Sequence, residues 1–168
     1  FLKNNPQYKF SVSHTTRPIR EGETNGTDYF FVTEEEFDNS IKNNEFLEWE
    51  SFSGNKYGTK KATIEKSLKK GDNLILKLDT KGALNIKQMF PEAVLIFIKP
   101  PSLEELESRL RGRKTETEEI IQARLKKAKG EMDKAVNYQY VVINDKVNRA
   151  SKEISKIIKD RIKQNMKK

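Results

Sequence analysis

A polar loop near the start of the chain contains the residue types that recognise a phosphate monoester. The loop, Thr15–Thr27, includes Arg17 and Arg20, whose planar guanidinium groups can each donate hydrogen bonds to two oxygen atoms at once. Tyr29 follows the loop, and Tyr57 lies in a glycine-rich segment further along, so two phenol hydroxyls are additional donors. Two solvated loop arginines are the commoner meaning of such a pair, but the combination with phenol groups suits a phosphate ligand.

Two carboxylates, Glu48 and Asp79, are candidates for recognising a purine base. An ionised carboxylate only accepts hydrogen bonds, and a guanine edge presents two adjacent donors, the N1–H and the exocyclic amino group. Adenine presents an acceptor at N1, so such a carboxylate would select guanine. The ordinary alternatives are that Glu48, which shares a strand face with Glu50, faces water, and that Asp79 caps the helix that follows it.

Three later arginines can compensate negative charge. Arg109 and Arg113 are one helical turn apart, and Arg124 falls on the next predicted helix. Glu105 lies four residues before Arg109, which predicts a surface ion pair worth about 0.3–0.5 kcal/mol. Taken alone, the spacing favours the ion pair over a catalytic role.

Composition excludes several kinds of chemistry. The chain has no Cys and a single His, His14, which excludes disulfides, thiolate nucleophiles, cysteine-ligated zinc or iron–sulfur sites and a His-rich metal site. The longest clean apolar run, Ala93–Ile98, is far shorter than the ~20 residues that span a bilayer, and no signal-type apolar stretch opens the sequence. We therefore expect a soluble, cytoplasmic protein without a membrane partner.

The net charge of +8 is concentrated at one end of the chain. Residues 146–168 include nine Lys or Arg and two Asp or Glu, so this segment carries +7 and residues 1–145 carry only +1. Apolar residues at helical spacing predict one amphipathic helix with a solvated lysine face. These residues are Ala150, Ile154, Ile157, Ile158 and Ile162. A nucleic-acid-binding domain is an alternative that rests only on the lysines, and we expect no nucleic-acid partner.

The first half of the chain predicts short strands and helices that position the loop. The expected strands are Lys9–Ser13, Asp28–Val32 and Glu45–Phe52. Thr33 and Glu36 have the spacing of a capping box, which predicts a helix to about Asn43. Ser53–Gly58 has the composition of a glycine-rich turn, and a helix is expected over about Thr59–Lys70.

From Leu74 onward the pattern predicts an α/β core. Three short apolar runs are separated by helical stretches, as in a parallel sheet covered on both faces. The runs are Leu74–Asp79, Ala93–Ile98 and Tyr140–Ile143. Capping patterns of Ser102 with Glu105 and of Thr115 with Glu118 predict a helical hairpin between the last two runs. Ligands gather beyond the carboxyl ends of such strands, where the chain has Asp79, Lys99, Asn144 and Asp145.

Nearly the whole chain resembles the guanylate kinase family. The blocks that carry the resemblance occur in one order along the sequence, which makes it highly specific. They are Phe10–Arg17, Gly22–Glu23, Gly26–Tyr29, Phe46–Trp49, Phe52–Asn55, Tyr57–Thr59, Pro100–Ser102, Arg113–Glu118 and Ile143–Asp145. The resemblance implies an α/β fold of the P-loop NTPase type, with a parallel-sheet core, a small mixed or antiparallel GMP-binding subdomain and a helical lid.

As one guanylate-kinase-like domain over residues 1–168, the chain would have three regions. The GMP-binding subdomain would cover residues 11–63, the core residues 64–101 and 135–168, and the lid region residues 102–134. The resemblance implies transfer of the γ-phosphoryl group of ATP to GMP, giving ADP and GDP in purine nucleotide metabolism. The expected ligands are GMP, ATP and Mg²⁺, and the expected assembly is a monomer or a homodimer.

The resemblance also implies roles for individual residues. Those expected at the GMP phosphate are Arg17, Arg20, Tyr29 and Tyr57. Those expected to read guanine, or to support its reader, are Ser13, Glu48, Thr59 and Asp79. The catalytic lid arginines would be Arg109, Arg113 and Arg124, which would compensate charge on the phosphoryl group in transfer. Asn144 would lie toward the adenine of ATP.

The sequence departs from the family pattern in two places. The family begins with a strand, a glycine-rich phosphate loop and a helix, yet no G-x-x-x-x-G-K-[ST] occurs in these 168 residues. We therefore expect a fragment of a complete kinase that does not turn over alone, with Mg²⁺ held by the missing loop and the nucleotide phosphates and by no protein residue of this chain. Lys77 stands where the family usually has an acidic residue near the metal, and it is an alternative candidate for neutralising phosphate charge directly.

The main alternative function is a non-catalytic guanylate-kinase-like module that binds a phosphorylated peptide through the same arginine and tyrosine pocket. The missing phosphate loop fits this alternative. Glu48, Asp79 and the three lid arginines argue against it, because a peptide binder has no chemical need for them.

Overall fold

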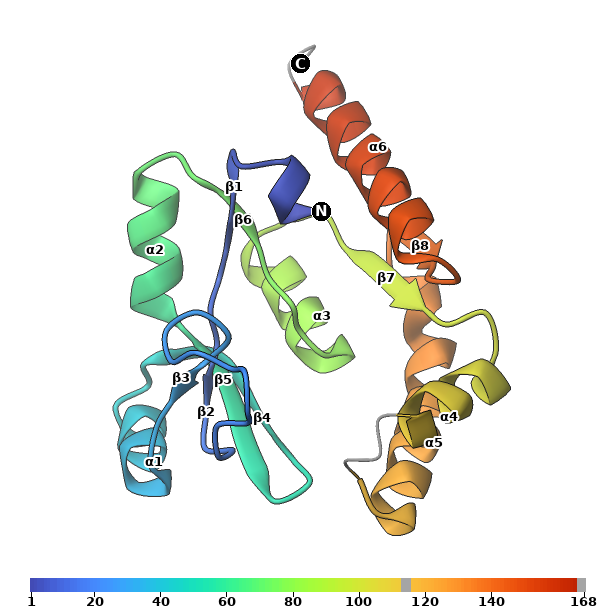
Figure 1. The fold of residues 1–168 in the computed structure, drawn as a ribbon. Helices are drawn as coiled ribbons and strands as arrows, with labels where there is room; N and C mark the ends of the chain where they lie inside the picture. The colour runs from blue at the N-terminus through green and yellow to red at the C-terminus, as the bar shows by residue number, and fades with distance from the viewer. Residues whose placement is uncertain (113–115, 166–168) are drawn as a thin grey trace. The chain divides into compact units, whose positions relative to one another are not determined.

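The computed structural model describes residues 1–112 and 116–165, and contacts within the chain divide it into two compact units (Figure 1). One unit is Leu2–Pro91, and the other is Glu92–Lys168 together with Phe1. All eight residues expected to bind GMP belong to the first unit, whereas the expected lid arginines and Asn144 belong to the second. The α/β class predicted from the sequence is confirmed.

The main sheet of the first unit is built around a β-hairpin. Its strands, β4 (Phe46–Phe52) and β5 (Asn55–Lys60), are antiparallel. They are joined by Ser53 and Gly54, which have φ of 51° and 75°. Two successive left-handed residues produce the turn that suits the right-handed twist of a hairpin. The hairpin therefore sets the register of both strands.

Two very short strands extend this sheet. Strand β2 (His14–Thr15) pairs antiparallel with β5, and β3 (Phe30–Phe31) pairs parallel with β2, so the order is β3–β2–β5–β4. The arginine-containing loop connects β2 to β3 and is therefore anchored at both ends in one sheet (Figure 1).

Helix α1 (Glu34–Lys42) packs an aromatic ring against the sheet. Phe37 is fully buried, and its ring stacks on that of Phe46 with centroids 4.4 Å apart. The expected capping box is present: Thr33 Oγ1 accepts the Glu36 N–H at 3.1 Å, and Glu36 Oε2 accepts the Thr33 N–H at 2.8 Å. The helix predicted from this pattern is confirmed.

The glycine-rich turn expected over Ser53–Gly58 is wrong in its extent, whereas the helix expected over about Thr59–Lys70 is confirmed as Lys61–Lys69. Only Ser53 and Gly54 turn, and the following residues form β5, with the helix beginning at Lys61. Because β5 forms hydrogen-bonded ladders with β2 on one side and β4 on the other, long-range pairing overrides the local turn composition. Gly58 serves packing: an added Cβ there would lie 2.8 Å from the ring of Phe46.

The first unit also contains a pair of parallel strands, β1 and β6, and two helices. The remaining elements of this unit are η1 (Leu2–Asn4), β1 (Tyr8–Phe10), α2 (Lys61–Lys69), β6 (Asn73–Ile75) and α3 (Thr80–Met89). The strand expected over Leu74–Asp79 is shorter than predicted, because the backbone leaves the ladder after Ile75 and runs irregularly to the start of α3.

The second unit contains the expected pair of parallel strands and helical hairpin. Its elements are β7 (Ile96–Lys99), α4 (Leu103–Gly112), α5 (Glu118–Asp133), η2 (Lys134–Asn137), β8 (Tyr140–Ile143) and α6 (Val147–Asn165). Helices α4 and α5 pack side by side (Figure 1). The N-cap of α5 is Thr117 and not the expected Thr115, which lies outside the described residues.

Each unit contains strands of the expected parallel core. In the described residues these strands pair in parallel as β1 with β6 in the first unit and as β7 with β8 in the second, while β2 and β3 form a further parallel pair within the four-stranded sheet. An apolar run indicates that a segment becomes a buried strand, but it contains no information about which other strand becomes its neighbour.

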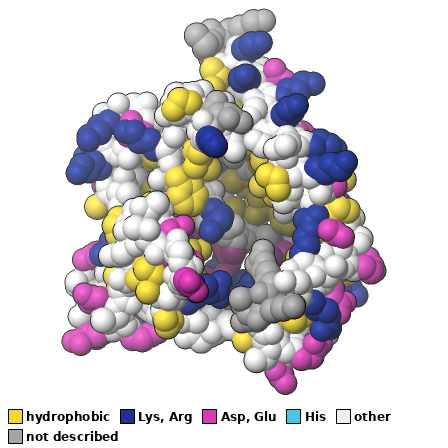
Figure 2. Space-filling view, viewed as in Figure 1, with side chains coloured by type: hydrophobic (Ala, Val, Ile, Leu, Met, Phe, Trp, Pro, Cys, Tyr) yellow, Lys and Arg dark blue, Asp and Glu magenta, His cyan; other side chains and the backbone are white. Residues whose placement is uncertain are grey.

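Helix α6 is amphipathic, as predicted. Ala150 is buried and Ile154 and Ile158 are half-buried, whereas Lys152 and Lys156 are exposed. Figure 2 shows Lys and Arg side chains along the outside of this helix. The excess positive charge is thus the solvated face of one helix, and no helix in the described part of the chain is long and apolar enough to cross a membrane.

Candidate functional site

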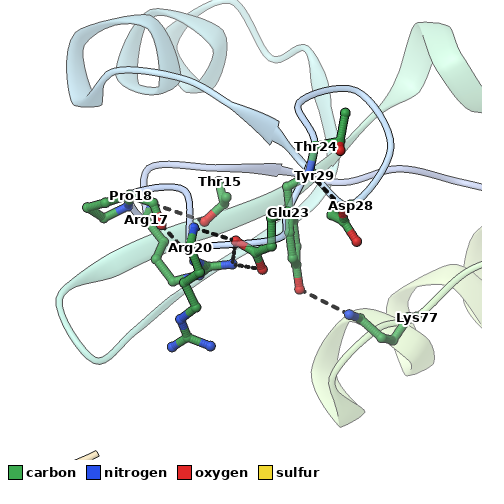
Figure 3. A network of polar contacts seen from close by, with 9 residues as sticks. All are labelled: Thr15, Arg17, Pro18, Arg20, Glu23, Thr24, Asp28, Tyr29 and Lys77. Carbon is green, nitrogen blue, oxygen red and sulfur yellow. Dashed lines mark hydrogen bonds and ion pairs between the residues drawn. The ribbon is translucent and has the colours of Figure 1, made fainter. Parts of the chain in front are cut away.

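Arg17 is held by a bidentate ion pair with Glu23 (Figure 3). Arg17 Nη2 donates to the two Glu23 carboxylate oxygens at 2.7 and 2.9 Å, and Arg17 Nη1 donates to the Pro18 carbonyl at 2.6 Å. This ion pair raises the pKa of the Arg17 guanidinium, and hydrogen bonds from Arg17 and from the Arg20 N–H lower the pKa of Glu23. Because the Arg17 side chain is only 10% exposed, it is a cation of well-defined position.

The loop backbone holds Glu23 in place. The Glu23 N–H donates to the Arg20 carbonyl at 3.1 Å, and the Arg20 N–H donates to Glu23 Oε2 at 2.8 Å. Gly22 has φ of 81° in this turn, a conformation that glycine adopts without steric cost. Glu23 was not among the site residues expected from the sequence. The sequence feature that could have identified Glu23 is an acidic residue next to a glycine, three positions after Arg20 and six after Arg17.

Tyr29 and Tyr57 lie beside Arg17. Tyr57 is opposite Thr15 in the β2–β5 ladder, and Tyr29 immediately precedes β3. The two phenol rings meet edge to face with centroids 6.1 Å apart, and the Arg17 guanidinium carbon is 5.5 Å from the centre of the Tyr29 ring. Arg20 comes from the same loop, and its exposed guanidinium makes no hydrogen bond within residues 1–112 and 116–165. The four residues expected at a phosphate therefore belong to one sheet and its loop.

Glu48 is held from the neighbouring strand. Glu48 and Thr59 are paired across the β4–β5 ladder, and Thr59 Oγ1 donates to Glu48 Oε1 at 2.6 Å. Burial raises the pKa of Glu48 and the negative charge of Asp79 adds to the rise, while the Thr59 hydrogen bond opposes it. The alternative that Glu48 simply faces water is therefore wrong. It is a partly buried carboxylate with one oxygen fixed by a fully buried threonine.

The first turn of α3 lies against the Glu48 carboxylate. A Cβ added to Gly82 would be 2.8 Å from Glu48 Oε2 and 3.1 Å from Asp79 Oδ1. Asp79 Oδ1 accepts the Gly82 N–H at 2.7 Å, so Asp79 caps the helix, as one of its two interpretations predicted. The carboxylates of Asp79 and Glu48 therefore both lie at the first turn of α3. Gly82 was not expected from the sequence. The sequence feature that could have identified Gly82 is a glycine three residues after a capping aspartate.

Ser13 is the expected base-reading residue with the least support in the geometry. It is half-buried just before β2, and its carbonyl accepts the Phe30 N–H at 2.9 Å. Within the described ranges its hydroxyl makes no hydrogen bond to Glu48, Thr59 or Asp79.

Arg109 is tied to the carboxyl end of β8. Its Nε donates to Glu105 Oε1 at 2.7 Å, which confirms the ion pair expected from their spacing. Its Nη1 donates to the Asn144 carbonyl at 2.8 Å, and the Asn144 N–H donates to the Lys99 carbonyl at 2.8 Å. Lys99 and Asn144 therefore meet at the carboxyl ends of adjacent parallel strands, as the topology argument predicted.

Arg124 on α5 forms an ion pair with Glu116 at 2.7 Å, and the Glu116 side chain is only 5% exposed. Arg113, the third expected lid arginine, lies outside the described residues. The two arginines that are described are thus both bound to acidic partners of their own unit.

Possible metal ligands are not clustered in the described part of the chain: no three His, Cys, Asp or Glu side chains there are grouped so as to hold a metal ion.

Comparisons with known proteins agree on one family. The family model for guanylate kinase matches residues 1–161. A guanylate kinase of Fusobacterium nucleatum is 46% identical over 153 residues, which are 91% of this chain and 83% of that protein. One of Bacillus cereus is 46% identical over 158 residues, covering 94% and 77% of the two chains. The crystal structure of guanylate kinase from Anaplasma phagocytophilum matches with a TM-score of 0.79 and 36% identity, over 94% of this chain and 78% of that one.

Proposed function

The chain belongs to the guanylate kinase family, and we propose that it transfers the γ-phosphoryl group of ATP to GMP, giving ADP and GDP. The proposal rests on this membership and on the geometry of the first unit. There, a partly buried carboxylate suited to guanine and a cluster of guanidinium and phenol groups suited to phosphate are built on one four-stranded sheet.

The observation that carries the proposal is the placement of Glu48. Thr59 fixes one carboxylate oxygen at 2.6 Å, and the backbone of Gly82 leaves room for the other. An ionised carboxylate has about four lone-pair positions, so Glu48 can accept the guanine N1–H and amino group in addition to the threonine hydroxyl. We assign a supporting role to Asp79, which caps α3 next to the Glu48 carboxylate.

The GMP phosphate is assigned to Arg17, Arg20, Tyr29 and Tyr57. Arg17 is pre-positioned by Glu23, so little side-chain entropy is lost when it binds a phosphate. Arg20 contributes a guanidinium that has no carboxylate partner in the described residues. A donor that is held in position, as Arg17 is, binds an anion more tightly than a flexible surface cation.

The second unit supplies the groups assigned to phosphoryl transfer. Transfer needs alignment and compensation of charge on the moving phosphoryl group more than it needs covalent chemistry. We assign this compensation to Arg109, Arg113 and Arg124, and contact with the adenine of ATP to Asn144. We propose that Mg²⁺ is bound together with the nucleotide phosphates.

Isothermal titration calorimetry of the 168-residue chain with GMP and with AMP tests the proposed base recognition. We expect GMP to bind and AMP to bind much more weakly. Glu48→Gln replaces one acceptor with a donor, so GMP affinity should fall roughly 10- to 100-fold, as for the loss of one hydrogen bond to a charged group. Glu65→Gln, at an exposed position of α2, is the control that removes the same charge.

The pH dependence adds a second readout. Because burial raises the pKa of Glu48, GMP affinity should begin to fall at a higher pH than for an ordinary glutamate, as the pH is lowered. Equal affinity for AMP and GMP would refute the assignment of Glu48 to guanine recognition. Phosphoryl transfer itself is measured by a coupled assay of ADP formation. A phosphoserine peptide that binds more tightly than GMP would favour the alternative of a non-catalytic module that binds a phosphorylated peptide.

A further inference from the structure

We propose that Lys77 is a third cation of the GMP phosphate site and binds the substrate phosphate directly, beside Tyr29. This inference rests on the proposed function, because it assumes that Arg17, Arg20, Tyr29 and Tyr57 surround the phosphate. It assigns Lys77, which the sequence analysis gave as a candidate for neutralising phosphate charge, to the phosphate of GMP.

The contact that carries the inference joins two distant parts of the first unit. Lys77 lies in the irregular segment between β6 and α3, and its Nζ donates to Tyr29 Oη at 3.0 Å although 48 residues separate the two (Figure 3). The same Nζ is 5.0 Å from the centre of the Tyr29 ring. Tyr29 is thus contacted by Lys77 and by Arg17, whose guanidinium carbon is 5.5 Å from the ring centre.

The charges around this phenol are not balanced. Arg17 is paired with Glu23, whereas Asp28, whose Oδ2 accepts the Thr24 N–H at 2.7 Å, keeps its negative charge. Lys77 is exposed and forms no ion pair with a carboxylate within residues 1–112 and 116–165. The three cations Arg17, Arg20 and Lys77 therefore outnumber the two carboxylates of Glu23 and Asp28, and the excess positive charge suits a phosphate monoester, which carries close to two negative charges at neutral pH.

The hydrogen bond between Lys77 and Tyr29 is also compatible with binding of a phosphate by both side chains. Because Tyr29 Oη accepts a hydrogen from Lys77, its own proton remains available for donation to a phosphate oxygen. Donation by an ammonium group to the phenol oxygen polarises the O–H bond and strengthens the next hydrogen bond in the chain. Lysine has three N–H donors, and only one is used by Tyr29, so the same ammonium can contact the phosphate.

A comparison of GMP with guanosine by calorimetry separates the contribution of the phosphate group to the binding affinity from that of the base. Lys77→Met removes the charge at nearly constant length, and we expect it to weaken GMP binding about tenfold, as for the loss of one charge-assisted hydrogen bond. Lys77→Arg should retain GMP affinity within about threefold, and guanosine affinity should not change in either variant. Lys66→Met, at an exposed lysine of α2, controls for net charge.

A structural role for Lys77, in which it only orients Tyr29, is tested in the Tyr29→Phe background. If Lys77 contacts the phosphate, Lys77→Met should still weaken GMP binding there. If the effect of Lys77→Met vanishes once the hydroxyl is removed, direct contact is wrong.

The proposed function and the role of Lys77 can be refuted separately. A wild-type chain that binds guanosine and GMP equally would remove the phosphate site and the proposed function with it. A wild-type chain that prefers GMP, with Lys77→Met indistinguishable from Lys66→Met, would leave the proposed function intact and refute only the role of Lys77.

Discussion

Gly82→Ala tests whether the backbone of α3 leaves the space that Glu48 needs. The added Cβ would lie 2.8 Å from Glu48 Oε2 and 3.1 Å from Asp79 Oδ1, and both distances are shorter than an ordinary contact, which starts at 3.4 Å. The Glu48 carboxylate must therefore move by at least the difference of 0.6 Å at Oε2. It cannot do so freely, because Oε1 is held by Thr59 at 2.6 Å.

The substitution should separate ligand affinity from stability. Replacing glycine by alanine inside a helix stabilises a protein by about 0.5–1 kcal/mol when there is space. At Gly82 the displaced carboxylate offsets this gain, so we expect the free energy of unfolding to change by less than about 1 kcal/mol. GMP affinity should fall about tenfold, because the carboxylate no longer meets both guanine donors in line.

Gly130→Ala is the matched control. Gly130 is exposed on α5, and a Cβ added there meets nothing within 4 Å. This variant should become more stable by about 0.5–1 kcal/mol and bind GMP like the wild type. Urea unfolding and calorimetry of the three proteins provide the measurements.

The result that would refute the reasoning is a Gly82→Ala protein with wild-type GMP affinity and increased stability, like the control. The helix would then tolerate a side chain beside Glu48, and the position of the Glu48 carboxylate could not be what selects guanine. A loss of affinity in Gly130→Ala would be equally damaging, because it would show that helical glycines affect binding without touching the site.

Two further predictions concern stability. Thr33→Ala removes the cap of α1 and should lower the free energy of unfolding by about 1 kcal/mol in urea titrations, with Thr33→Ser close to the wild type. Burial lowers the pKa of His14 to about 4, whereas an unfolded histidine titrates near 6.5, so the folded state disfavours the charged ring. The stability that depends on the neutral ring is complete above about pH 6.5 and is lost as the pH falls toward 4; after allowance for partial exposure the loss is of order 1–2 kcal/mol. His14→Gln should abolish the part of the pH dependence between these values, and an unchanged profile in this variant would show that another group causes it.

Residue types and local spacing were sufficient to predict many of the elements around the candidate site. The capping box of Thr33 and Glu36, the ion pair of Glu105 with Arg109 and the amphipathic face of α6 all involve residues within a few positions of one another. Such interactions depend only on the local backbone, so their patterns are visible in the sequence. General rules for parallel sheets placed Lys99, Asn144 and Asp145 at the carboxyl ends of strands, but the pairing of β7 with β8 was not predicted.

Contacts between distant segments were decided by the tertiary structure alone. Ser53–Gly58 has the composition of a turn, yet most of it is a strand, because hydrogen bonds to β2 and β4 outweigh local preference. The same packing brings Gly82 against Glu48 and Lys77 against Tyr29. No short-range pattern indicates these contacts, since they depend on how whole strands and helices pack. The sequence by itself therefore indicated which groups are candidates for binding a guanine and a phosphate, and only the tertiary structure decided which of these groups lie together.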